Sequence, residues 1–465
     1  MQRLAVSWIF LVGYLALQLG LTLWVSRSIA SENDFFVGGR TLKTGFVAFS
    51  MFASWFGAET CLGASGAIYE SGLAGGRADP FGYSLCLLFM GLFLAVPLWR
   101  GGYMTLGDLF RARYGVAIER LVVFVLVPSS LIWAAAEVRA FGQVLGGVMG
   151  LKVTLAIYIS AIFVVAYTSF GGMLGDVYTD VIQGTILASG LFILLVLGVS
   201  DLGGPVQALA QVEPQRWNLL HHDETAWQQL DRFSVPILGS LVAQELIARV
   251  AACNAATTAR RASFWACGIY LIVGSSPVVL GLLGPTLAPH LQDPEQLLPT
   301  LASRLLPRFG YALFACALIS AILSTINSIL LAAAALISHN LIVPAFKLQG
   351  ERAKVVCARL MVVASGGFAL IVALGADGIY GLVEMASGFG TAGVLVTTLA
   401  GLFLPFGGPK AAAAGLLVGA VSTPLAEYGF DLPAPFLTAI GFAAAAYVIV
   451  ALVERAPARV VAAEG

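Results

Sequence analysis

The stretch 53–72, ASWFGAETCLGASGAIYESG, constrains this chain most, because it is apolar enough for membrane depth but carries a glutamate and several glycines. In a bilayer core every backbone N–H and C=O must be hydrogen-bonded within the protein. A glycine-broken helix is therefore tolerated only where it is buried in protein or lines a water-filled cavity. The carboxylate of Glu59 is equally costly there and is typical of an ion or substrate path. The stretch predicts a transporter built around a discontinuous helix.

The composition fits a polytopic membrane protein made only of helices. Of the 465 residues 59% are hydrophobic and 11% are charged, whereas about a quarter of an average soluble domain is charged. The formal net charge is zero, so no nucleic-acid partner is indicated. The six cysteines have no metal or redox spacing, and no P-loop, nucleophile elbow or histidine cluster is present. We therefore expect no enzyme activity, and transport driven by a gradient or by passive flow.

About thirteen apolar runs are long enough to span a bilayer. They lie near 5–25, 45–72, 80–99, 120–148, 153–171, 177–200, 233–255, 262–286, 309–343, 355–375, 379–405, 411–428 and 434–454. Lysine and arginine gather in one set of alternate loops, which the positive-inside rule places in the cytoplasm. This predicts a multi-pass protein of the plasma (bacterial inner) membrane, with its N-terminus outside and its C-terminus cytoplasmic. The first run lacks a cleavage site and is expected to be a retained helix.

Two connections between the runs have a character of their own. The segment 105–115 is amphipathic and basic, which predicts a helix at the cytoplasmic interface. The polar loop 201–232 is expected outside, and its His221 and His222 are interpreted as a solvated pair in preference to a metal site.

The ninth run contains SAILSTINS, in which Ala321, Ser324 and Thr325 share one helix face. Two hydroxyls and a carbonyl form a hard-oxygen surface for a sodium ion. Carbonyls freed at Ala53 and Phe56, where the second run unwinds, could supply the other ligands. The alternative is that these hydroxyls bond to their own helix or serve as small packing residues.

Several acids lie within apolar segments. Asp176 and Asp180, in GGMLGDVYTD between the fifth and sixth runs, are either a cation relay at a cytoplasmic turn or helix caps. Glu384, beside glycines in LVEMASGFG, is a candidate substrate or proton contact. Glu245 and Arg249 are four residues apart and are expected to pair with each other near the cytoplasmic end, the alternative being a direct role in transport.

Two further charges lie in the fourth run. Glu137 and Arg139 are two residues apart, so their side chains face different directions and each needs a partner elsewhere.

The chain resembles the sodium/solute symporters, which include bacterial proline, pantothenate, sialic acid and sugar transporters and the mammalian sodium/glucose transporters. The resemblance is carried by DFFVGGR after the first run, by ASWFGAETCLGASGAIYESG, by GGMLGDVYTDVIQG and by SAILSTINS. It implies a LeuT-type fold with two inverted five-helix repeats. The implied division is 1–44 (first helix and loop), 45–200 (first repeat), 201–232 (outer loop), 233–405 (second repeat) and 406–465 (two final helices and tail).

The resemblance also implies roles for individual residues. The sodium ligands would be the carbonyls of Ala53, Phe56 and Ala321 and the hydroxyls of Ser324 and Thr325. Asp180 matches the acid of the family's sodium exit route, and Glu59 and Thr60 are the candidate substrate contacts.

Two departures from the family bear on the substrate. Proline transporters carry an acid where Trp55 stands, and sugar transporters usually carry an amide at Thr60. A pair of buried carboxylates, Glu59 and Glu384, would suit a solute with an amino or quaternary ammonium group, since a paired buried charge costs less than a lone one.

The predicted function is a secondary active symporter that imports a small organic solute with sodium by alternating access, an amino acid or organic amine being favoured. The alternatives are a carrier that is proton-coupled or uncoupled, with Asp180 or Glu384 as the coupling element, and a transporter-like solute sensor. The expected partners are the solute, sodium and the lipid bilayer, and the expected state is a monomer or a weak homo-oligomer.

Overall fold

The computed structural model describes residues 2–221, 223–376, 382, 386 and 390–454. Within these ranges the chain forms helices and no β-strand; a single isolated bridge joins Leu42 to Cys253. The predicted all-α fold is confirmed.

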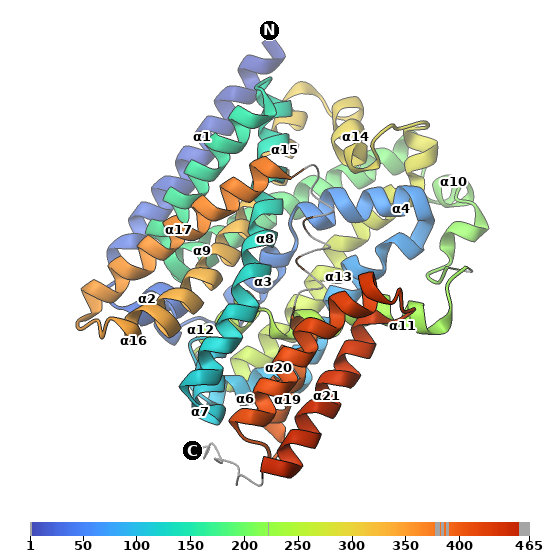
Figure 1. Cartoon of the computed structure of the whole chain (residues 1–465). Coiled ribbons are helices and arrows are strands. Elements are labelled where there is room, and N and C mark those ends of the chain that lie inside the picture. Colours follow the sequence, from blue (N-terminus) through green and yellow to red (C-terminus); the bar gives the residue numbers. More distant parts are fainter. Residues whose placement is uncertain (1, 222, 377–381, 383–385, 387–389, 455–465) are drawn as a thin grey trace.

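The helices of the first half are labelled as in Figure 1. They are α1 (Gln2–Val25), α2 (Glu32–Val37), α3 (Thr44–Trp55), a π-helical turn (Glu59–Ala64), α4 (Ser65–Ser71), an irregular turn (Arg77–Gly82), α5 (Tyr83–Phe89), α6 (Ala95–Arg100), α7 (Leu106–Tyr114), α8 (Val116–Met149) and α9 (Val153–Asp201).

The second half continues with α10 to α21, among which α18 is not used. They are α10 (Pro205–Ala210), α11 (Ala226–Leu238), α12 (Gln244–Ala252), α13 (Ala256–Leu287), α14 (Leu297–Leu305), α15 (Arg308–Ile337), α16 (Val343–Ala345), α17 (Glu351–Gly375), α19 (Thr391–Phe403), α20 (Pro409–Pro424) and α21 (Pro435–Glu454).

The described residues contain nine helices that are long and apolar enough to span a membrane, or ten if the bent pair α11 and α12 counts as one span. Part of the difference from thirteen lies in α9, in which two expected spans, one on each side of Gly172, follow each other without a loop. The chain changes direction there at Gly172, whose φ of 53° favours glycine. A Cβ at Gly172 would stand 2.7 Å from the carbonyl oxygen of Phe35. The count of thirteen stays a prediction.

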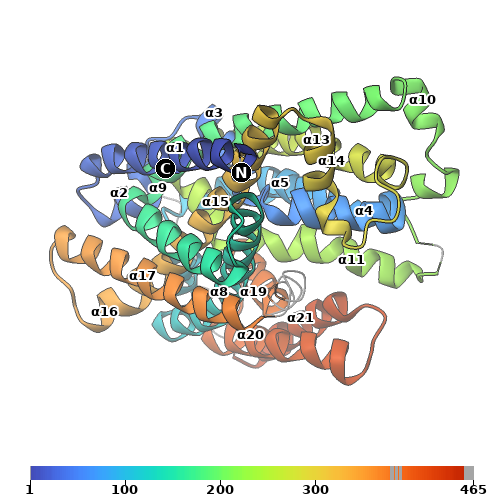
Figure 2. The ribbon, with the colours of Figure 1, turned by 90° about the horizontal axis from the view of Figure 1, so that it is seen from above.

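Helix α15 forms the centre of the molecule. Its most apolar window is 94% buried, and it packs against α1, α8, α9 and α17, which surround it in Figure 2. A helix that is apolar on every face is suited to such a position. Any hydroxyl on α15 therefore faces other helices.

The loops gather at two ends of the molecule, and α1 begins at one end while α21 ends at the other (Figure 1). At one end Arg40 donates to the carbonyl of Tyr103, and Arg113 donates to the carbonyl of Phe406. We call this the basic end. At the opposite end Arg216 donates to the carbonyl of Tyr69. The predicted alternation of loops agrees with these contacts; which end faces the cytoplasm stays a prediction from the charge pattern.

Two helices are interrupted at related positions in the chain. Helix α3 ends at Trp55 and the chain resumes as a helix through 58–71, whereas α11 and α12 meet at a 48° bend. These are the first helices of the two predicted repeats, where discontinuous helices are expected in inverted-repeat transporters.

Candidate functional site

The break after α3 releases backbone carbonyls from helical pairing. Phe56 has φ −83° and ψ 67°, outside the helical region, and its N–H makes the last helical bond, to the carbonyl of Phe52 at 3.0 Å. The carbonyls that follow in the helix must find other partners.

Neighbouring side chains satisfy only one of these carbonyls. That of Trp55 accepts bonds from the hydroxyls of Thr60 at 3.4 Å and Tyr270 at 3.2 Å. Within the described residues no hydrogen bond reaches the carbonyls of Ala53 and Phe56. Both predicted sodium ligands of this helix therefore have free lone pairs.

Helix α15 touches the break at Gly57. A Cβ on Gly57 would stand 2.5 Å from the hydroxyl oxygen of Thr325, so the approach requires glycine. The Thr325 hydroxyl donates to the carbonyl of Ala321 at 3.2 Å, and Ser324 donates to Asp180 at 2.5 Å. The structure thus brings Thr325 of α15 to the interrupted helix; the sodium ligand set stays a prediction. Hard-oxygen groups of this kind are what a small hard cation prefers.

Asp180 belongs to a buried ionic network on the basic side of the break. The Arg249 guanidinium lies 2.5 Å from a carboxylate oxygen of Asp176 and 3.3 Å from one of Asp180. Ser50 also donates to Asp180, at 2.5 Å. Each of the three ionised side chains is at most 1% exposed. The network joins α3, α9, α12 and α15.

Two sequence interpretations are corrected by this network. Asp176 and Asp180 lie inside α9 and not at a solvent-facing turn, because Gly172 turns the chain without a loop. The side chain of Arg249 does not pair with the carboxylate of Glu245; it donates only to the Glu245 backbone carbonyl, at 3.1 Å. Arg249 thus pairs with the carboxylates of Asp176 and Asp180 on α9 and not with the carboxylate of Glu245, one turn away on its own helix.

A cavity of about 980 Å³ extends from the break to the end opposite the basic end. Carboxylates dominate its wall among the described residues; they belong to Glu59, Glu70, Asp79, Glu224, Asp231, Asp293, Glu295, Glu427 and Asp431. The arginines of the wall are Arg77 and Arg232. Arg77 is already paired with Glu224. The cavity is therefore strongly acidic.

Two carboxylates lie at the deep end of the cavity. Glu59 accepts a bond from the hydroxyl of Tyr83 at 3.1 Å. One oxygen of Asp79 accepts bonds from Thr60 and, at 3.2 Å, from Tyr270. The other Asp79 oxygen is buried with no hydrogen-bond partner in the described structure. The Asp79 carboxylate thus lies at the cavity wall with one oxygen unused in hydrogen bonding.

The predicted substrate contacts take different places. Glu59 lines the cavity, whereas Thr60 is fully buried behind it and holds Asp79. Glu384 lies outside the described residues. Asp79 itself was missed, because the expected span began at Pro80. The available signal was an acid directly before proline, a position that favours the extended conformation found at Asp79 (φ −134°, ψ 121°).

Five buried aromatic rings lie behind these carboxylates. This aromatic cluster consists of Phe52, Trp55, Phe56, Tyr83 and Tyr270, and neighbouring ring centroids are between 5.0 and 6.5 Å apart. The indole N–H of Trp55 donates to a third buried acid, Glu245, at 3.1 Å. Aromatic N–H and O–H groups thus hold three carboxylates around one cluster.

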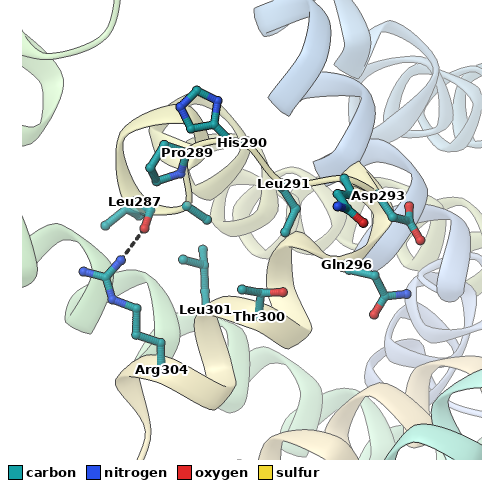
Figure 3. Close-up of a pocket in the computed structure, with 11 residues that line it drawn as sticks. Leu287, Pro289, His290, Leu291, Asp293, Gln296, Thr300, Leu301 and Arg304 are labelled. Carbon is teal, nitrogen blue, oxygen red and sulfur yellow. Dashed lines mark hydrogen bonds between the residues drawn. The ribbon is translucent and has the colours of Figure 1, made fainter.

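A second hollow, of about 550 Å³, lies between α13 and α14 (Figure 3). Arg304 donates there to the carbonyl of Leu287 and pairs with Asp201 at 3.1 Å. None of the predicted site residues lines it. Among the described residues there is also no group of three or more His, Cys, Asp or Glu side chains able to hold a metal ion; His222 lies outside them.

A discontinuous apolar helix with free carbonyls, packed on a hydroxyl-bearing helix at the base of a one-sided cavity, defines an ion-coupled secondary transporter. The sequence matches the family model described as the sodium:solute symporter family over residues 35–420. The chain therefore belongs to the sodium:solute symporter family, a family of transporters and not of enzymes, in which sodium is the coupling ion.

Known proteins of this kind resemble the chain over most of its length. The high-affinity choline transporter 1 of Torpedo marmorata is 28% identical over 389 residues, which cover 78% of this chain and 66% of that protein. The human choline transporter gives the same percentages over 387 residues. The chain thus spans just under two thirds of these relatives. The human sodium/iodide cotransporter is 27% identical over 447 residues, covering 91% of this chain and 68% of that protein.

Solved structures show the same fold. A Na⁺-coupled sialic acid symporter in a substrate-bound outward-open state matches with a TM-score of 0.86 at 19% identity, covering 98% of both chains. Mhp1, a nucleobase-cation-symport-1 family transporter, matches with a TM-score of 0.61 at 13% identity, covering 90% of this chain and 95% of that one. The predicted LeuT-type fold is confirmed.

Proposed function

We propose that this protein is a sodium-coupled symporter of a small organic cation with a quaternary ammonium head, choline being the first candidate. The observation that carries the proposal is the pair of carboxylates, Glu59 and Asp79, at the deep end of the acidic cavity. The choline transporters among the relatives point to the same class of solute.

The charge of the cavity separates this substrate from those of other relatives. A cleft lined by one sign of charge concentrates ligands of the opposite sign. Nine acids against two arginines attract cations and repel anions such as iodide or a monocarboxylate. The relatives named for those anions are therefore weaker guides to the solute.

The aromatic cluster supports the choice of a quaternary head. Such a head has no N–H to donate, so it is recognised by charge and by cation–π contact. Tyr83 and Tyr270 lie directly behind the cavity wall, where each has a ring in the cluster and a hydroxyl on a carboxylate. The carboxylate of Asp79, which lines the cavity, supplies the counter-charge.

Sodium is proposed to bind to the carbonyls of Ala53, Phe56 and Ala321 and the hydroxyls of Ser324 and Thr325. The contact between Gly57 and Thr325, and the free carbonyls of the break, support this set. Asp180 is proposed as the first group on the exit route, since it accepts a bond from Ser324.

Binding of sodium and binding of solute are coupled because the two proposed sites are close together in the sequence. Glu59 lies one helical turn after the carbonyl of Phe56, so ion and solute both order the same break. Each ligand then raises the affinity of the other, and such coupling is typically about 1–3 kcal/mol. Both would be carried across together as the repeats rock.

The test is uptake of labelled choline by proteoliposomes under an inward gradient of sodium, of potassium or of protons. Its matched competitor is 3,3-dimethylbutanol, which replaces the charged nitrogen by carbon and keeps the shape. We expect uptake only with sodium, and competition by unlabelled choline but not by the alcohol. Uptake driven by protons in sodium-free buffer would favour the proton-coupled carrier, and saturable binding without uptake would favour a sensor.

A further inference from the structure

Glu137, on α8, points at the break in α3. It is 2% exposed. Its Oε1 atom lies 3.0 Å from the place where a Cβ on Gly57 would stand, and the hydroxyl oxygen of Thr325 lies 2.5 Å from that same place. The backbone N–H of Ala58 donates to the Glu137 carboxylate. The acid therefore reaches the point where α15 meets the interrupted helix.

The second oxygen of Glu137 has no hydrogen-bond partner within the described structure. No ion pair with Glu137 is found among the described residues either. Arg139, two residues away, donates instead to the carbonyl of Ala373 at 3.0 Å. A buried ionised carboxylate without a cationic partner is costly, so its place at the break calls for a cation.

The sodium ligand set proposed above consists only of neutral oxygens. Asp180 contributes charge nearby, but it already shares Arg249 with Asp176 and accepts bonds from Ser50 and Ser324. Glu137 accepts the N–H of Ala58 but has no ion pair among the described residues, and it approaches from α8, a helix that supplies none of the neutral ligands. Asp79 also has a free buried oxygen and no ion pair in the described residues, but it lies on the cavity side, whereas Glu137 lies at the contact between Gly57 and Thr325.

We propose that Glu137 is the charged member of the sodium site, where it provides the counter-charge for the ion held by the break and α15. This rests on the proposed sodium coupling. A sodium ion next to Glu137 would neutralise the buried acid and draw α3, α8 and α15 together at Gly57. The ion thereby stabilises the state whose cavity is open.

The experiment measures the thermal stability of purified protein without solute, while sodium replaces potassium at constant ionic strength. The variants are Glu137→Gln, Glu137→Asp and, as a matched control, Glu119→Gln. Glu119 is also a glutamate of α8, is 1% exposed and has one oxygen without a hydrogen bond, but that oxygen lies 3.8 Å from the guanidinium of Arg111, and the other accepts from Asn340 far from the break. Ser324→Ala serves as the reference for a lost neutral ligand.

We expect Glu137→Gln to raise the sodium concentration for half-maximal stabilisation at least tenfold, with Glu137→Asp between this variant and the wild type. In potassium alone, the melting temperature of Glu137→Gln should be no lower than that of the wild type, because the substitution removes an unpaired buried charge. If Glu137 had only a structural role, the substitution would lower the melting temperature. Glu119→Gln should keep the wild-type sodium midpoint.

An unchanged midpoint in Glu137→Gln, together with a raised midpoint in Ser324→Ala, would overturn the assignment of Glu137 and leave the proposed function intact. Absence of any sodium effect on the wild type would instead overturn the sodium coupling itself, and this inference with it.

Discussion

The two halves of this transporter use the same charged residue types in opposite ways. On the basic side of the break, arginine and histidine are locked to acids: Arg249 to Asp176 and Asp180, and His339 to Glu32 at 3.2 Å and Asp108 at 3.1 Å. On the other side, the two acids at the deep end of the cavity, Glu59 and Asp79, accept bonds from tyrosine hydroxyls and form no ion pair among the described residues. Paired charges close one half, and these two acids leave the other ready for a cation. This is the arrangement of a carrier open on one side.

The largest effect should come from breaking the closed half at Arg249. Arg249→Gln leaves Asp176 and Asp180 buried without their cation, and removal of one partner of a buried pair costs about 3–5 kcal/mol. We expect a strongly lowered melting temperature in detergent. Adding Asp176→Asn should recover part of the loss. A melting temperature close to that of the wild type would show that the network does not hold this half together.

The boundary between the halves is tested at Ser324 and Thr325. Either residue changed to Ala should raise the sodium requirement for uptake about tenfold or more, which corresponds to about 1.4 kcal/mol, while folding is retained. Ser189→Ala is the control, since Ser189 bonds only to its own helix at the carbonyl of Thr185. Equal sodium dependence in all three variants would contradict the site.

In the open half, the residue to test is Asp79. Asp79→Asn should weaken choline binding by about tenfold, as expected when a hydrogen bond to a charged group is lost (about 1.5–3 kcal/mol). Asp231→Asn is the control: this acid also lines the cavity, but it accepts the backbone N–H of Leu437 at 2.7 Å. The control should lower stability and leave choline affinity unchanged. Weakened choline binding in Asp231→Asn, with unchanged binding in Asp79→Asn, would instead place the solute near Asp231 and away from the break.

The smallest effect concerns Asp108, at the N-terminus of α7. Burial raises the pKa of this acid, but bonds from His339 and from the backbone N–H groups of Thr105 and Met104 outweigh it, so the pKa lies below its ordinary value of 3.8. The stabilisation is therefore complete above pH 3.8 and is lost only as the pH falls through the lowered pKa. Asp108→Asn should cost about 1 kcal/mol for the lost cap. The cost should be larger at pH 6 than at pH 8, because the substitution also removes a carboxylate partner of His339, and its interaction with the charged imidazole stabilises the fold most below the ordinary histidine pKa of about 6.5. Thermal melts at both values test this, and an equal or larger cost at pH 8 would contradict it.

The sequence predicted the break well because the cause is local. Glycines and an acid within an apolar run cannot form an ordinary lipid-facing helix, and the structure interrupts the helix at Phe56. The face of Ala321, Ser324 and Thr325 follows from helical spacing alone. Asp79 and the partners of Arg249 could not be found in this way, because their contacts join residues far apart in the chain, such as Arg249 and Asp176.

The sequence by itself determined that this protein is a helical membrane transporter with a discontinuous helix, since hydrocarbon tolerates unpaired backbone and buried acids only on a protected path. Tertiary structure alone decided what each acid does. Asp176 and Asp180 share one counter-charge because α12 brings Arg249 against α9, whereas in the described part of the chain Glu59 and Asp79 accept bonds from hydroxyls alone. Whether a buried carboxylate closes the protein or binds a ligand depends on the charge opposite it, and packing places that charge.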